Sequence, residues 1–254
     1  MIVIAHLSDT HIDSEPRSAE RTRAVMEYLD DLPYDLAAVL VTGDVTDHAL
    51  PAEYERARGL LASRHPVLVC PGNHDGREAF RTHLLGQPAS SAPINQVHRT
   101  DGLVIALCDS SVPGKDEGLL EQETLEWLEG VLEETPPQVP VLVGFHHPPV
   151  LLHDPFIDGL RQFGAERLAA LAGRYPQLAG FLCGHAHTAA ATVFAGRPLV
   201  VAPGVVSTLR LPWEHRGPAE DGADHVYLDQ PPALAFHVLD DEGRLTTHFR
   251  NVPA

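Results

Sequence analysis

Residue types that bind metals or transfer protons directly follow several short apolar segments of the chain. The segment IVIAHLS leads into Asp9 and His11, and FLCG leads into His185 and His187. Imidazole, carboxylate and amide oxygens suit divalent transition ions, and the lack of cysteine in the set favours an open catalytic site over a closed structural zinc site. The polar residues that follow such segments are Asp9, His11, Asp44, Asn73, His74, His146, His185 and His187.

Each of these clusters also has an ordinary structural explanation. A lone histidine after a strand is more often a hydrogen-bonded turn residue than a ligand, and Gly-Asp or Asn at a strand end is common turn chemistry. Similar polar residues also follow VLVTG, VLVCPG and VLVGF, so turn preference would have to produce the same coincidence repeatedly. The recurrence favours one shared pocket.

The elements that must position these residues are short β-branched segments alternating with amphipathic ones. Strands are predicted at MIVIAHL, LAAVLVTGD, PVLVC, LVIALCD, VPVLVGF and LAGFLCGH, with helices over residues 17–32, 51–62, 121–134 and 157–174. Near-continuous apolar strands indicate a largely parallel sheet covered by helices. After His187, the segments AATVFAG, RPLVVAPG, ALAFHVLD and LTTHFRN predict antiparallel strands, and we expect a second sheet packed on the first.

The polar clusters are then expected at one edge of the sheet, because ligands of open α/β sheets bind beyond the carboxyl ends of the strands. Residues two apart at a strand end point to the same side, so that each Asp-x-His or His-x-His pair can face one pocket. By the same geometry the adjacent side chains of His146 and His147 should diverge.

Length and composition restrict the function classes. We expect the 254 residues to form a single domain over 1–254, and the acidic stretch 214–232 is predicted to be a lid or a homodimer interface. A formal net charge of -17 counts against long nucleic acids and anionic membranes as partners, although a metal pocket can still attract a small phosphate ester. The chain start MIVIAHLSD lacks a basic signal region, which favours the cytoplasm.

In order along the chain, SDTH, TGDVTD, PGNHD, GFHHPP and CGHAH resemble the motifs of the calcineurin-like metallophosphoesterases. Within that family, the chain is similar to the bacterial class III cyclic-nucleotide phosphodiesterase and glycerophosphodiesterase group. The resemblance covers residues 4 to about 205. It implies an α/β fold of four layers, an α-β-β-α sandwich of two packed mixed sheets flanked by helices.

The resemblance also implies two divalent transition-metal ions, with Fe or Mn favoured and Zn or Co compatible. Asp9, His11 and His187 would hold one ion, and Asp44 would bridge to the other. The second ion would be held by Asn73, His146 and His185. A metal-activated hydroxide would then attack phosphorus.

Other residues near these motifs have supporting roles in this reading. His74 would contact a phosphoryl oxygen or protonate the leaving alkoxide, beside Asn73 as a further substrate contact. Asp47 and Asp75 would orient neighbours without touching a metal. The family pattern places His146 at the metal, which leaves His147 as a rim support or a substrate contact. The segments GREAF, LLHDPFIDG with His153, and the one after APGVVSTLRLP are expected to decide the substrate.

The predicted function is a metal-dependent hydrolase of small phosphodiesters, with 3′,5′- or 2′,3′-cyclic nucleotides such as cyclic AMP preferred. Glycerophosphodiesterase or broad phosphoesterase activity is the alternative. A binding scaffold without catalysis is an alternative of another class, against which the complete motif set counts. The acidic charge and the lack of a basic stripe count against a nuclease.

Overall fold

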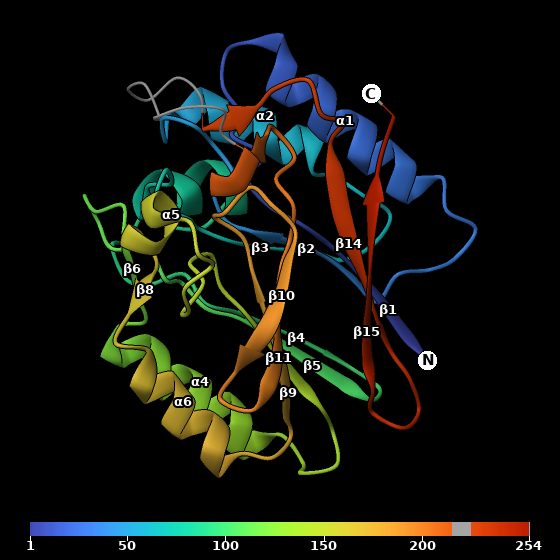
Figure 1. Ribbon diagram of the computed structural model, residues 1–254, viewed down its shortest axis with the longest axis vertical. Helices are drawn as coiled ribbons and strands as arrows, with labels where there is room; N and C mark the ends of the chain where they lie inside the picture. Colours follow the sequence, from blue (N-terminus) through green and yellow to red (C-terminus); the bar gives the residue numbers. More distant parts are fainter. Residues whose placement is uncertain (215–224, 254) are drawn as a thin grey trace.

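A computed structural model describes residues 1–214 and 225–253, in which two mixed β-sheets form the centre of the molecule (Figure 1). The first sheet has the strand order β15-β14-β1-β2-β3. Its parallel strands come from the start of the chain and its antiparallel strands from the end. The strands are β1 (Ile2–Leu7), β2 (Ala38–Thr42), β3 (Val67–Cys70), β14 (Ala233–Leu239) and β15 (Leu245–Asn251).

The second sheet has the strand order β10-β11-β9-β7-β5-β4 and takes the middle of the chain. Strands β5, β7, β9 and β11 run parallel, while β4 and β10 are antiparallel edges. The strands are β4 (Gln96–Thr100), β5 (Leu103–Leu107), β7 (Val141–Gly144), β9 (Leu178–Cys183), β10 (Ala190–Phe194) and β11 (Arg197–Val201). The pairs β6 (Gly118–Leu119) with β8 (Gln162–Phe163) and β12 (Thr208–Leu209) with β13 (Val226–Tyr227) form small ribbons.

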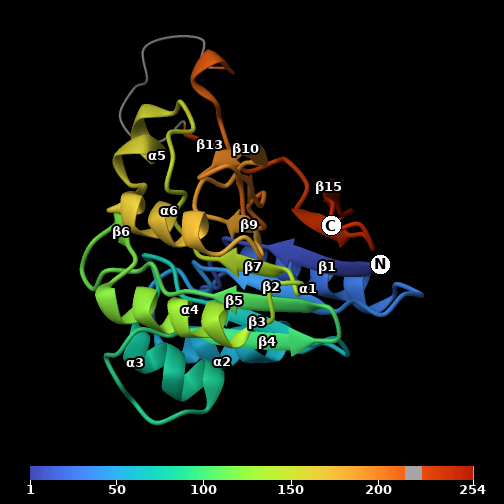
Figure 2. The same cartoon turned by 90° about the horizontal axis from the view of Figure 1, so that it is seen from below.

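Helices cover the outer faces of both sheets (Figure 2). Helices α1 (Pro16–Asp30) and α2 (Pro51–Leu60) pack on the first sheet, together with α3 (Arg77–Ala79) and the π-helical η1 (Phe80–Leu85). Helices α4 (Gln122–Glu134) and α6 (Ala165–Arg174) lie side by side on the second sheet. These bounds agree with the predicted helices to within a few residues, except between residues 157 and 174.

Strand alternation divides the buried side chains among three apolar layers. In β1, Ile4 packs between the two sheets, whereas Ala5 and Leu7 pack against α1 and α2. In the second sheet, Ile105 faces the inter-sheet layer and Ala106 faces α4 and α6. Because successive residues of a strand point to opposite faces, apolar strands supply both layers at once. The four-layer α-β-β-α prediction is confirmed.

The single helix predicted over residues 157–174 is wrong. The segment forms a short helix α5 (Pro155–Gly159), the strand β8 and then α6. Asp154 caps α5 by accepting hydrogen bonds from the backbone N–H groups of Phe156 and Ile157 at 2.9 and 3.1 Å. Gly164 has a left-handed φ of 66°, which a helix interior does not accommodate. The break places α5 beside the functional site described below.

The last four predicted strands are present but do not build one antiparallel unit. Strands β14 and β15 extend the first sheet, while β10 and β11 extend the second. Strand β11 is parallel to β9, contrary to prediction. The reason is the hairpin through Ala195 and Gly196, both with left-handed φ, which returns the chain between β10 and β9.

The stretch 214–232 lies largely outside the described residues. The 3-10 helix η2 (Pro212–Glu214) precedes the gap and β13 follows it, so that the lid and interface interpretations stay predictions, as does the single domain over 1–254. In the part of the chain that the structure covers, no helix is both long and apolar enough to cross a bilayer.

Two buried histidines join strands of the first sheet in a polar chain. His6 Nδ1 lies 3.0 Å from His237 Nε2, and His6 Nε2 lies 2.8 Å from the hydroxyl of Thr42. His237 Nδ1 lies 2.8 Å from the hydroxyl of Thr247. Burial lowers the pKa of His237 to about 3, and burial together with His237 lowers the pKa of His6. Both rings are therefore neutral in the fold.

We expect the metal-free protein to lose stability as the pH falls from 6.5 toward 3. In this pH window His237 binds a proton in the unfolded chain but stays neutral in the fold. Each such histidine lowers the free energy of unfolding by about 1.4 kcal/mol per pH unit. His237→Gln should reduce the slope of unfolding free energy against pH, measured by urea unfolding. The control His248→Gln, at an exposed position of the same sheet, should keep the wild-type slope. Equal slopes in all three proteins would contradict the expectation.

Candidate metal centre

The predicted ligands lie together beyond the carboxyl ends of the strands, but the backbone that brings them there is not extended. Left-handed φ angles of 55°, 41°, 48°, 70° and 51° occur at Asp9, His11, Asp44, His185 and His187, respectively. Such angles are uncommon outside glycine and gather at functional sites. The ligand pairs thus converge through turns, and the strand-alternation argument for them was wrong.

Neighbouring loops hold these turns by continuing the pairing of β1 and β2 past the strand ends. The backbone N–H groups of Asp9 and His11 donate to the carbonyls of Gly43 and Asp44 at 3.2 and 2.9 Å. The N–H of His185 donates to Asp9 Oδ2 at 3.1 Å, which ties the end of β9 to the end of β1. The strained residues are therefore fixed by the two sheets together.

Asp9, His11 and His187 form the first cluster of ligand atoms. The Nδ1–H of His11 donates to Asp47 Oδ1 at 2.8 Å, and His187 Nδ1 is hydrogen-bonded to the hydroxyl of Ser207 at 2.7 Å. Their Nε2 atoms therefore face each other at 3.2 Å, and Asp9 Oδ1 lies 3.5 Å from His187 Nε2. Contacts of this kind fix which ring nitrogen carries the lone pair.

The second cluster forms around His146, which is fully buried. Its Nδ1–H donates to the carbonyl of Thr42 at 2.7 Å, so that Nε2 faces the site. Asn73 Oδ1 and His185 Nδ1 each lie 3.2 Å from this Nε2. An imidazole, an amide oxygen and a second imidazole therefore meet at one point.

Asp44 stands between the two clusters. Its Oδ2 lies 3.5 Å from His11 Nε2 and 3.3 Å from His146 Nε2, while Oδ1 accepts the backbone N–H of His74 at 2.9 Å. The carboxylate is 2% exposed. One buried carboxylate is thus shared by the ligand groups of both clusters.

The electrostatics show that a positive charge is needed here. Burial disfavours charge on His146, yet the neighbouring Asp44 outweighs it and raises the His146 pKa to about 9. Burial opposes ionisation of Asp44 as well, but His146 and His11 hold the pKa of Asp44 well below its usual range. Burial and then His146 lower the His185 pKa to about 3. A proton on His146 therefore supplies part of the charge that the carboxylates require.

The donor set fits two divalent cations. Asp9 Oδ1 and His185 Nε2 are buried and have no hydrogen-bond partner within residues 1–214 and 225–253, which is costly for polar atoms. The lone pairs of His11 and His187 converge, as those of metal ligands do. Ligand atoms within 4.8 Å of one another are found in the groups Asp9, His11, His187 and Asp9, Asp44, His146. Imidazole and carboxylate together suit Fe, Mn, Zn or Co.

His74 lies at the edge of this cluster with its side chain 41% exposed. Its Nδ1–H donates to the backbone carbonyl of Asp47 at 2.9 Å, which leaves Nε2 for a ligand. The side chain of Asp47 holds His11 instead. Asp75 is partly buried and accepts hydrogen bonds from the N–H groups of Val45 and Gly72 at 3.0 and 2.9 Å. It therefore braces the loops that carry Asp44 and His74.

The side chains of His146 and His147 do not diverge as expected. Their rings meet edge to face with centroids 4.7 Å apart, because β7 ends at Gly144. His147 is fully buried, hydrogen-bonded to the hydroxyl of Ser110 at 2.8 Å, and its Nε2 lies 3.2 Å from the carbonyl of Asp116. These contacts favour the supporting role, and a substrate contact by His147 stays a prediction.

A cavity of about 380 Å³ opens over the metal centre. His11, Asp44, Asn73, His74, His185 and His187 line one part of it. The rest of the wall comprises Asp116, Phe156, Ile157, Leu160, Leu209, His225 and Val226. Phe156 falls within a segment that the sequence marked as deciding the substrate, and His225 and Val226 lie after APGVVSTLRLP in the predicted lid or interface 214–232, but Asp116, Leu160 and Leu209 gave no signal. In the GREAF segment, Arg77 faces Asp109 at 2.8 Å instead.

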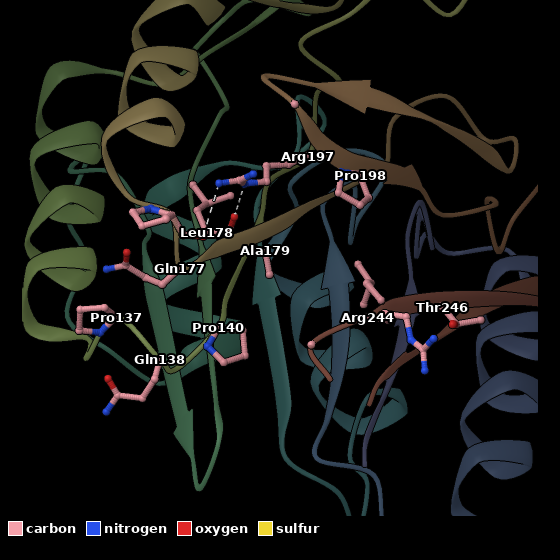
Figure 3. A pocket seen from close by; sticks show the side chains of 14 residues that line it. Pro137, Gln138, Pro140, Gln177, Leu178, Ala179, Arg197, Pro198, Arg244 and Thr246 are labelled. Atoms are coloured by element: carbon pink, nitrogen blue, oxygen red, sulfur yellow. Dashed lines mark hydrogen bonds between the residues drawn. The ribbon is translucent and has the colours of Figure 1, made fainter. Parts of the chain in front are cut away.

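A larger hollow of about 650 Å³ lies at the opposite, amino ends of the strands (Figure 3). Its lining residues include four prolines and the polar residues Gln138, Gln177 and Thr246, and its charged groups are Arg197 and Arg244. Arg197 donates to the carbonyl of Leu178 at 2.7 Å, and Arg244 pairs with Asp240 at 2.8 Å. Because both cations are engaged and no acid or base converges there, the chemistry lies at the smaller cavity.

Comparisons with known proteins all find similarity to phosphoesterases. Residues 2–189 match the family model described as calcineurin-like phosphoesterase. The chain is 32% identical to a glycerophosphodiester phosphodiesterase of Enterobacter lignolyticus, covering 93% of this chain and 86% of the relative. It is also 32% identical to a cAMP/cGMP dual specificity phosphodiesterase of Mycobacterium tuberculosis, covering 89% and 76% of the two chains.

A solved structure shares the fold. A dimetal phosphatase of Danio rerio superposes with a TM-score of 0.72 over 98% of this chain and 96% of its own, at 14% sequence identity. At this low sequence identity, the superposition shows a shared arrangement of sheets and helices and nothing further. The four layers described above are therefore the metallophosphoesterase fold.

Close packing around Asp44 yields a stability prediction. A Cβ at Gly72 would lie 2.2 Å from Asp44 Oδ1 and 2.8 Å from His146 Cδ2, so that Gly72→Ala must displace one of them. We expect a loss of about 1–3 kcal/mol in the free energy of unfolding, as for other overpacked sites. Urea unfolding of the metal-free protein measures it.

The matched control is Gly59→Ala in helix α2, where a Cβ would meet nothing within 4 Å. Removing a helical glycine there should stabilise the protein by roughly 0.5–1 kcal/mol. A Gly72→Ala protein as stable as the Gly59→Ala protein would show that the loop is not tightly packed.

Proposed function

Because the chain belongs to the calcineurin-like phosphoesterase family, we propose that it is a binuclear metal-dependent phosphodiesterase acting on small phosphodiesters, with cyclic nucleotides as substrates. The position of Asp44 carries the proposal. A carboxylate oxygen within 3.5 Å of histidines from both clusters suits a ligand shared by two cations. The cytoplasm as its location and a homodimer as its assembly remain part of the proposal.

In this proposal Asp9, His11 and His187 hold one ion. The second would be held by Asn73, His146 and His185, and Asp44 would be shared by the two. Bound there, two divalent ions would activate water for attack on phosphorus and neutralise the charge on the phosphoryl oxygens. Fe and Mn are the proposed ions, as the family resemblance implies, and a set of imidazole and carboxylate without thiolate is compatible with both.

The chain's own groups then orient the substrate and move the proton. The hydrogen bond from His74 Nδ1–H to the Asp47 carbonyl fixes the ring and leaves Nε2 for the substrate. Protonated at Nε2, His74 donates to a phosphoryl oxygen or to the leaving alkoxide. The amide nitrogen of Asn73 is a second donor to phosphate, because its oxygen faces His146.

Small substrates are favoured over nucleic acid by the charge of the site. No Lys or Arg belongs to the cavity wall among the described residues, and the net charge of the chain is -17. A long polyanion gains its affinity from many such cations. The glycerophosphodiester phosphodiesterase relative supports glycerophosphodiesters as the second candidate substrates.

The decisive experiment is turnover by protein loaded with defined metals. Chelated protein reconstituted with Mn²⁺ or Fe²⁺ should hydrolyse bis(p-nitrophenyl) phosphate and cyclic AMP, and chelated protein should not. Release of p-nitrophenol and of AMP measures the two rates. A protein that binds the ions but hydrolyses neither diester with Mn²⁺, Fe²⁺, Zn²⁺ or Co²⁺ would instead be a binding scaffold.

The metal content of two variants distinguishes the proposed roles of Asp44 and His74. Asp44→Ala should weaken retention of both ions, because it removes the shared ligand. His74→Ala should keep both ions and lower kcat by roughly 100-fold or more, the scale of a lost general acid. Metal analysis by mass spectrometry and steady-state kinetics make the comparison.

The control is His83→Ala, on η1, which does not line the cavity and should resemble the wild-type protein in both respects. Loss of an ion from His74→Ala would reassign His74 as a ligand.

A further inference from the structure

An aromatic side chain at the wall of the cavity over the metal centre is exposed to solvent. Phe156 is 54% exposed, although a phenyl ring normally gains most by burial. Its ring stacks on that of His225, with centroids 5.3 Å apart and planes inclined by 19°. Both residues line the cavity that contains His11 and His74. A flat aromatic surface therefore faces the same space as the metal centre.

Two separate parts of the chain hold this ring pair in place. Asp154, itself 4% exposed, caps α5 through the backbone N–H of Phe156 and so fixes the helix that carries the ring. On the other side, the carbonyl of His225 accepts the backbone N–H of Arg210 at 2.7 Å, next to the β12–β13 pairing. Figure 2 shows α5 and β13 above the carboxyl ends of the second sheet. The aromatic surface is thus anchored at both sides.

The rest of the outer wall consists of four aliphatic residues and one acidic residue that can accept hydrogen bonds. Ile157, Leu160, Leu209 and Val226 line it, together with Asp116. The carbonyl of Asp116 accepts a hydrogen bond from the buried His147, which links the cavity wall to the centre of the protein. The cavity therefore has a polar end at the metal centre and a flat apolar end with an acceptor.

We infer that Phe156, stacked on His225, is a specificity-determining residue that receives the nucleobase of a nucleotide diester, while Asp116 accepts from N–H groups of the base. This inference rests on the proposed phosphodiesterase function and adds the group that the outer cavity selects. Stacking of one base on one aromatic side chain changes affinity by about tenfold or more. A volume of about 380 Å³ is within the range of small-molecule sites.

The same wall offers a rival ligand, the ammonium headgroup of a glycerophosphodiester. Aromatic faces and a carboxylate attract such cations. Here, however, the two rings stack on each other and every other outer-wall side chain except that of Asp116 is aliphatic, so that an ammonium ion would be desolvated on most sides. A flat, neutral nucleobase loses little hydration free energy on entering this space. The geometry therefore favours the base.

The test compares two diesters in Mn²⁺-loaded protein, cyclic AMP with a base and glycerophosphoethanolamine without one. Phe156→Leu keeps an apolar side chain but removes the ring. We expect the ratio of kcat/KM for cyclic AMP to that for glycerophosphoethanolamine to fall about tenfold. Phe156→Tyr keeps the ring and should retain the wild-type ratio to within about twofold.

Phe163→Leu is the matched control, because Phe163 is also exposed but lies on β8 outside the cavity wall. It should retain the wild-type ratio. Binding of AMP to the Mn²⁺-loaded proteins, measured by calorimetry, gives a readout independent of turnover. The Kd for AMP should rise about tenfold in Phe156→Leu and stay at the wild-type value in Phe163→Leu.

These measurements separate the two claims. A wild-type protein that hydrolyses neither diester refutes the proposed function, and the AMP affinities then decide the role of Phe156 alone. Turnover in the wild type with an unchanged ratio and unchanged AMP affinity in Phe156→Leu overturns the inference. A greater loss with glycerophosphoethanolamine than with cyclic AMP overturns it in favour of the ammonium headgroup.

Discussion

The carboxylate of Asp44 is nearly excluded from water and lies within 3.5 Å of imidazole nitrogens from two parts of the chain. A buried carboxylate in such a place requires positive charge, since burial disfavours an uncompensated ion strongly. In the metal-free protein the raised pKa of His146 supplies a proton for this purpose. In the proposed enzyme two cations take over that role. The arrangement of loops around the site follows from this need.

The fold orients the lone pairs of the histidine nitrogens toward the proposed metal positions without help from a bound cation. Thr42 on β2, Asp47 in the following loop and Ser207 just before β12 each hold the far nitrogen of one histidine. The near nitrogens consequently face inward, where the left-handed turns have brought them together. Such turns cost energy that only a rigid surrounding can repay. Two sheets with three apolar layers provide that rigidity.

The outer wall of the cavity over the metal centre is formed by segments that carry none of the proposed ligands. The break between α5 and α6 places Phe156 at the cavity wall, and the β12–β13 ribbon brings His225 against it. In the proposed enzyme, chemistry and selectivity are therefore carried by different parts of the fold. The motif loops follow strands of the two large sheets, whereas most of the outer wall comes from a short helix and a small ribbon, which is joined to the metal centre by the hydrogen bond from the N–H of Leu209 to the carbonyl of His187.

The sequence alone determined the strands, because apolar periodicity is a local property, and the resemblance of its motifs to a known family implied the four-layer class and the candidate ligand set. Asp9, His11 and Asp44 could be named from their motifs. Tertiary structure decided how they converge, since left-handed turns held by neighbouring strands replaced the expected extended strand ends. It also decided that His147 is buried, that residues 157–174 contain a break, and that Phe156 meets His225, which is 69 residues further along the chain. Such contacts depend on packing between distant segments, which no local pattern of residues encodes.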